Sequence, residues 1–156
     1  MYFRTGGVSD KNEYLFAIAD LAPQLELLEF SCDHLAAQGV EAVLRSCKSL
    51  KSLYLYPTGS SQISMDTFCD IARHCQRLET LHLQFFSDSG TQLPERCFPF
   101  LKSLSIGEHS RLSENFFREV AKNCSRLDKL DVAACTGVTD SVLEGFLKFH
   151  RNNFTS

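Results

Sequence analysis

The chain has 156 residues, of which 44% are hydrophobic and 22% are charged, and its net charge is −3. These values are close to globular averages, so we expect one domain with a packed core rather than a disordered segment. The basic residues form no cluster, which argues against nucleic-acid binding. No apolar run approaches the roughly 20 residues of a membrane-spanning helix, which argues against a membrane protein.

The cysteines indicate the compartment and the metal chemistry. Their number is odd, no C-x-x-C pair occurs, and the first ten residues lack the apolar stretch of a secretory signal. We therefore expect free thiols, a cytoplasmic or nuclear location, and neither zinc nor any other cofactor. The seven cysteines are Cys32, Cys47, Cys69, Cys75, Cys97, Cys124 and Cys135.

The first 22 residues predict an incomplete structural unit. Residues 14–21 have helical spacing, and Val8-Ser9-Asp10 before them is similar to Val138-Thr139-Asp140 near the other end. The chain is therefore expected to begin in the loop after a strand that is missing. The residues predicted to face inward from this helix are Leu15, Ile18 and Ala19.

Five copies of the pattern L-x-x-L-x-L follow at intervals of 23 to 28 residues. The second and third apolar positions of each copy are two residues apart, so they point to the same side of a short strand. Repetition at this period is typical of leucine-rich repeats. The five predicted strand segments are residues 25–30, 50–55, 78–83, 101–106 and 127–132.

Helical spacing returns between and after these segments. One apolar stripe is formed by Phe116, Phe117, Val120 and Ala121, and another by Val142, Leu143, Phe146 and Leu147. A strand and a helix that are each apolar on one side can bury those sides by stacking in successive units. We therefore predict an α/β leucine-rich-repeat solenoid in which about five parallel strands line a concave face and the helices lie outside.

The positions of cysteine and proline sharpen this prediction. Cys47, Cys75 and Cys124 each stand three residues before the first leucine of a strand segment, and the last repeat adds Cys135. These features resemble the cysteine-containing repeats of leucine-rich F-box proteins. In those repeats a proline adjoins the cysteine, and Pro23 and Pro99 stand at that position here. We expect residues 1–156 to form a single domain of about five repeats that lacks terminal caps. Either it is a fragment of a longer gene product, or its terminal helices act as caps.

No catalytic motif accompanies the repeats. H-E-x-x-H, G-x-S-x-G, the P-loop and G-x-G-x-x-G are all absent, so we predict that the chain is not an enzyme. Arg73-His74-Cys75 places a base beside a thiol, but Cys75 falls at a repeat corner, where a packing role is expected.

The resemblance implies a protein-binding function. In leucine-rich F-box proteins the F-box docks an adaptor of an SCF-type ubiquitin ligase and the repeats hold the substrate. Residues 1–22 contain no F-box-like helical segment, so a stand-alone scaffold or regulatory protein is the alternative, and an RNA-binding solenoid comes third.

Alternate residues of the strand segments should face the concave surface and bind another protein, with the chain itself a monomer. Tyrosine is enriched at interface hot spots, and Tyr54, Tyr56 and His82 should lie together on two neighbouring strands. The remaining predicted partner-binding residues are Glu29, Gln84, Phe85, Phe86, Ser105 and Asp131.

Overall fold

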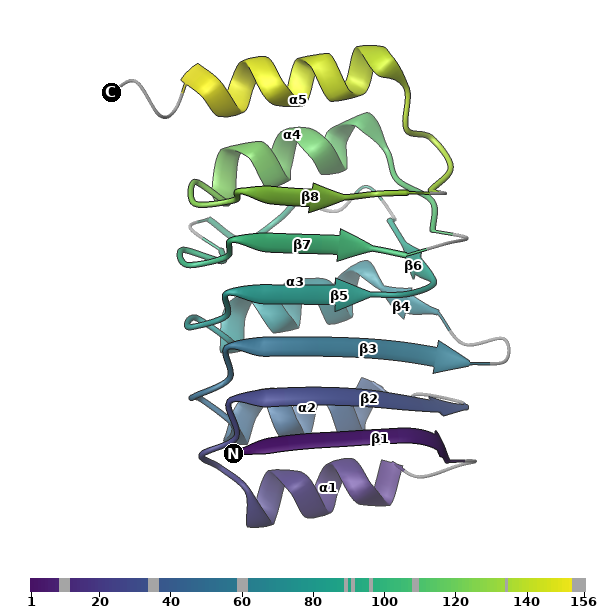
Figure 1. Ribbon diagram of the computed structural model, residues 1–156, viewed down its shortest axis with the longest axis vertical. Coiled ribbons are helices and arrows are strands. Elements are labelled where there is room, and N and C mark those ends of the chain that lie inside the picture. The colour runs from purple at the N-terminus through teal and green to yellow at the C-terminus, as the bar shows by residue number, and fades with distance from the viewer. Residues whose placement is uncertain are drawn as a thin grey trace.

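The computed structural model describes residues 1–8, 12–33, 37–58, 62–88, 90, 92–95, 97–107, 110–133 and 135–152. Over these residues the chain is an α/β protein with five helices and a parallel sheet of six strands (Figure 1). The strands of this sheet are β1 (Tyr2–Val8), β2 (Leu27–Asp33), β3 (Ser52–Thr58), β5 (Thr80–Leu83), β7 (Ser103–Ile106) and β8 (Lys129–Asp131). The helices are α1 (Asn12–Leu21), α2 (Ala37–Ser46), α3 (Met65–His74), α4 (Glu114–Asn123) and α5 (Asp140–Asn152). A second, two-stranded parallel sheet pairs β4 (Ile63–Ser64) with β6 (Phe86–Ser87).

The five strands predicted from the leucine pattern are confirmed, although each begins two residues after the start of its predicted segment, and their register is confirmed as well. Leu28 aligns with Leu53, and the same position continues through Leu81 and Leu104 to Leu130. The strands follow one another across the sheet in chain order, as Figure 1 shows. The chain therefore advances by one strand spacing per repeat, about 4.8 Å.

The predicted absence of a strand before Val8 is wrong. Tyr2–Val8 forms β1, which pairs in parallel with β2 and makes the sheet one strand larger than the five predicted. Phe3 and Thr5 align with Leu28 and Phe30, so this strand lacks the leucines that mark the others. Ser9 and Asp10, which the sequence assigned to the following turn, lie outside the described residues.

The core lies between the sheet and the helices. The inward leucines Leu53, Leu81 and Leu104 are at most 1% exposed. They pack against the apolar sides of the helices. Figure 1 shows two of these helices, α2 and α3, behind the sheet. Full burial of one such side chain contributes about 1.5–3 kcal/mol. The predicted inward residues of α1 and the stripe of α4 are confirmed as buried: Leu15, Ile18, Ala19, Phe116, Phe117, Val120 and Ala121.

The stripe predicted for α5 is only partly correct. Phe146 is buried and Val142 and Leu143 are half-buried, but Leu147 is 50% exposed. In the inner units an inward residue is covered by a neighbouring element on each side. Among the described residues no element lies beyond α5, so Leu147 has nothing to pack against on that side.

One unit replaces its helix with a loop. In the described residues between β6 and β7 no helix occurs, and Leu93, Cys97 and Phe98 of this segment are buried instead. Phe68 of α3 packs against the rings of Phe86, Phe98 and Phe116, with ring centroids 5.4, 5.2 and 5.7 Å apart. Aromatic side chains from four segments therefore fill the space between α3 and α4 that a helix would occupy.

The corner cysteines end the helices. Cys75 and Cys124 are the C-cap residues of α3 and α4, and their backbone N–H groups donate to Ile71 and Val120. The thiol of Cys47 donates to the carbonyl oxygen of Ala22 at the preceding corner, 25 residues earlier, with a distance of 3.4 Å. All three thiols are buried, so these cysteines fill the tight corners between successive units.

Candidate protein-binding face

One side of the six-stranded sheet carries the polar residues of the strands, and Figure 1 looks onto it. We call this side the open face, because in the described part of the chain no helix lies over it. Its residues alternate with the buried leucines and are half-buried, as in the pattern of β3 and β5. A central column runs across all six strands, and it consists of Arg4, Glu29, Tyr54, His82, Ser105 and Asp131.

An aromatic cluster occupies the middle of the open face. The ring of His82 lies 6.2 Å from that of Tyr54 and 5.0 Å from that of Tyr56, measured between centroids. These separations are within the range of favourable aromatic contacts. The structure therefore brings together the three residues that the sequence placed at the centre of a binding surface.

The protonation of this cluster follows from its partial burial. Burial lowers the pKa of His82 below its ordinary value, while Asp131 and Glu29 act in the opposite direction. Burial, with the nearby Glu29 and Tyr54, also raises the pKa of the Tyr56 hydroxyl. At neutral pH His82 is therefore a neutral imidazole, and the Tyr56 phenol keeps its proton.

Charge on the central column lies at its ends. Arg4 forms an ion pair with Glu29 across β1 and β2, with Nε and Oε2 2.9 Å apart. At the other end Oδ1 of Asp131 accepts from the backbone N–H of Ala133, at 3.2 Å, and within the described residues the carboxylate has no ion pair. Arg4 was not predicted as a site residue, since its strand carries no leucine pattern.

The predicted rim residues divide between the face and the core. Gln84 lies beside Gly107. A Cβ added to Gly107 would be only 3.1 Å from Cγ of Gln84, so the glycine leaves room for the Gln84 side chain. Phe85 is half-buried and has a φ of 54°, a left-handed conformation that reverses the in–out alternation after β5. Phe86 is consequently 1% exposed and packs in the core, so its prediction as a partner-binding residue is wrong.

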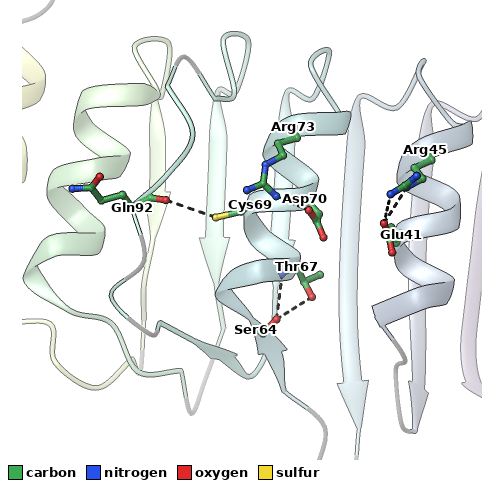
Figure 2. Close-up of polar contacts among 8 residues, drawn as sticks. All are labelled: Glu41, Arg45, Ser64, Thr67, Cys69, Asp70, Arg73 and Gln92. Carbon is green, nitrogen blue, oxygen red and sulfur yellow. Dashed lines mark hydrogen bonds and ion pairs between the residues drawn. The ribbon is translucent and has the colours of Figure 1, made fainter.

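The helices present a different kind of polar surface. Figure 2 shows Arg45 and Arg73 bound to Glu41 and Asp70 of their own helices, at 2.6 and 2.7 Å. Ser64 caps α3 by accepting from the backbone N–H of Thr67 at 3.2 Å. These charges are neutralised within single helices, as is usual for exposed helix surfaces.

Three buried thiols of the repeats have raised pKa values. Burial raises the pKa of Cys75 to about 12, with a smaller opposing effect of Lys48, so the predicted packing role at this corner agrees with its environment. Burial also raises the pKa values of Cys47 and Cys69. A reactive cysteine needs the opposite shift. In the described part of the chain no three His, Cys, Asp or Glu side chains gather as metal ligands would.

Two clefts lie near α5, away from the aromatic cluster. One, of about 320 Å³, is lined mainly by apolar residues of β8 and α5, among them Leu130, Leu143 and Leu147. The other, of about 180 Å³, lies between α4 and α5 against Phe117 and Phe146. Ligand sites usually combine an apolar wall with several convergent polar groups. Neither cleft contains a histidine or cysteine.

The architecture is that of an α/β protein with a leucine-rich-repeat-like parallel sheet. No protein-family model matches the chain. Over 128 residues the chain is 26% identical to the F-box/LRR-repeat protein 4 of Bos taurus, in a match that covers 80% of this chain. The chain spans 20% of the length of that curated relative, and the distant similarity supports a leucine-rich-repeat-like relationship. No helix among the described residues is both long and apolar enough to cross a membrane.

Proposed function

We propose that this chain is a non-enzymatic leucine-rich-repeat solenoid that binds another protein on the open face of its sheet. The observation that carries the proposal is the cluster of Tyr54, Tyr56 and His82 at the centre of that face. Tyrosine combines a large apolar area with a polar tip, and it is enriched among residues that dominate binding energy. The buried, weakly acidic thiols support a role without catalysis.

The size of the open face limits how the partner can bind. Six strands span about 24 Å at about 4.8 Å per spacing. A standard interface buries about 800 Å² on each partner. The partner would therefore contact nearly the whole face, including the rim residues Gln84 and Phe85 and the flanking Glu29, Ser105 and Asp131.

The finer proposal is substrate recognition for an SCF-type ubiquitin ligase, and hence a role in ubiquitin-dependent protein degradation. It is supported by the match to an F-box/LRR-repeat protein and by the predicted resemblance of the cysteine-containing repeats. It requires that the chain act as part of a longer F-box protein. We further propose a monomer that acts in the cytoplasm or nucleus. Because the match covers only 20% of the relative, a stand-alone scaffold without a ligase role is the alternative.

Site-specific crosslinking tests the binding face. A photoreactive benzoyl-phenylalanine is placed at Tyr54 in the full chain expressed in cells, and a matched control carries it at Lys122, an exposed residue of α4. We expect one protein to be crosslinked from position 54 and not from position 122. If a protein is crosslinked from position 122 and not from position 54, the open-face proposal is contradicted.

Affinity purification of the complete gene product tests the ligase proposal separately. An SCF substrate receptor should retain the ligase adaptor and a cullin through washes that remove abundant, non-specifically bound proteins. If the crosslinked partner is retained without either subunit, the scaffold alternative is favoured and the binding proposal stands.

A further inference from the structure

The two charged ends of the central column differ in how they are neutralised. Glu29 is held by Arg4, and both groups remain accessible, with side-chain exposures of 31% and 71%. Asp131 is half-buried and, within the described residues, has no cationic partner. Lys129 stands two residues earlier on β8 and forms no ion pair with it. The column therefore has an unbalanced negative charge at the β8 end.

Binding would make this imbalance costly. A protein that covers the open face removes water from Asp131, and an unpaired charge without water is strongly destabilising. The backbone N–H of Ala133 satisfies one oxygen only, at 3.2 Å. A positive group placed at the carboxylate compensates this cost best, because it supplies both hydrogen bonds and opposite charge.

The strand between His82 and Asp131 leaves space for such a group. β7 directs Ser103 and Ser105 to the open face, and Gly107 follows the strand directly, so only small residues stand here. A side chain inserted above Ser105 would lie about 4.8 Å from the column positions on either side. That separation lies within the roughly 6 Å at which a cation interacts with an aromatic ring, and it allows an ion pair on the other side.

The groups on the two sides favour arginine over lysine. The imidazole of His82 is neutral at pH 7 because burial lowers its pKa, so it does not repel a cation. A planar guanidinium can stack on that ring while its N–H groups donate to both oxygens of a carboxylate. An ammonium group can form the ion pair but cannot stack in the same way.

We propose that the partner segment on the open face inserts an arginine side chain above Ser105, between His82 and Asp131. This inference rests on the proposed function, because it identifies a specificity determinant of the same face. Tyr54 and Tyr56 supply apolar contact to the partner, and Asp131 selects a positive charge on the partner residue that is inserted above Ser105.

Peptide display on the full chain tests the inference. A library of short random peptides is selected on the wild-type protein and counter-selected on the Tyr54→Ala, Tyr56→Ala double variant. Peptides that need the tyrosines are synthesised with arginine, lysine or uncharged citrulline at each enriched basic position. Their affinities are measured for the wild type, for Asp131→Asn and for the control Asp128→Asn. An asparagine oxygen can still accept from Ala133, so Asp131→Asn should preserve the fold.

We expect arginine to be enriched at one position and its replacement by citrulline to weaken binding at least about tenfold. Asp131→Asn should cause a similar loss, Asp128→Asn less than about a twofold loss, and citrulline peptides should not distinguish the variants. Tyrosine-dependent peptides without arginine, or with equal affinity for Asp131→Asn, overturn the inference and leave the proposed function intact. Failure to select any tyrosine-dependent peptide also overturns it, whereas the crosslink from Tyr54 decides the proposed function independently.

Discussion

The two sides of the same strands have opposite characters. In β3 and β5, Leu53, Leu55, Leu81 and Leu83 are at most 1% exposed, whereas their neighbours Tyr54 and His82 are half-buried on the open face. Residues that are adjacent in sequence therefore belong to different environments, one that stabilises the fold and one that is available to a partner. The comparison teaches that stability and the proposed binding can be changed separately by substitutions one residue apart.

The largest loss of stability should come from the aromatic core beside α3. Phe68→Ala removes a fully buried ring that contacts Phe86, Phe98 and Phe116, where a loop takes the place of a helix. We expect the free energy of unfolding to fall by about 3–5 kcal/mol. Urea denaturation followed by circular dichroism measures it. A loss as small as that of a surface substitution would mean that these rings do not form the core.

The leucine side of the sheet should come next. Leu81→Ala and Leu104→Ala each leave a cavity, and we expect a loss of about 2–5 kcal/mol. Tyr54→Ala is the matched control on the open face, where the lost ring contact with His82 should cost about 0.5–1.5 kcal/mol. Equal losses in urea denaturation would mean that the strand register is shifted by one residue, which exchanges the two faces.

Acid should weaken the fold through His82. Its folded pKa lies below the unfolded value because of burial, so the unfolded chain takes up the proton first as the pH falls. Stability supplied by the neutral imidazole is present above the unfolded pKa of about 6.5 and decreases as the pH falls towards the folded pKa. The difference between wild type and His82→Gln in urea midpoints at about pH 7.5 and 5.5 isolates this residue. A pH response that is identical in the two proteins would contradict it.

The smallest effect is expected for an exposed ion pair at the edge of the open face. Lys102, which directly precedes β7, pairs with Glu79, which directly precedes β5, at 2.8 Å, and both side chains are exposed. Because exposed ion pairs contribute little, Lys102→Ala should leave the urea midpoint unchanged within error, at low and at high salt. A clear loss that disappears in high salt would show that this pair stabilises the sheet more than its exposure suggests.

The repeated strands and the aromatic cluster could be predicted from sequence, because a period-two apolar pattern fixes both register and facing. The same reasoning missed β1, in which Phe3 and Thr5 take the positions that leucine or phenylalanine fills in β2. Backbone pairing with β2 and not side-chain type defines that strand. Arg4, which neutralises Glu29, was missed with it.

Phe86 shows a second limit of the pattern. Phe85 and Phe86 were both placed at the rim because they follow Gln84, but the left-handed backbone of Phe85 changes the alternation and turns Phe86 into the core. No local signal indicates a positive φ at a phenylalanine, a residue that rarely adopts it. In the core the ring of Phe86 packs against the rings of Phe68 and Phe116, two contacts between residues far apart in sequence.

The central claim is that Tyr54 and Tyr56 form the main contact for a protein partner on the open face. The most direct measurement is the affinity of the crosslinked partner for the wild type and for the Tyr54→Ala, Tyr56→Ala double variant, with Lys122→Ala as the control. We predict that the double variant binds more weakly by at least about 2 kcal/mol while its circular dichroism spectrum is unchanged, and that the control binds normally. Undiminished affinity of a correctly folded double variant would contradict the claim and move the binding site to the helices.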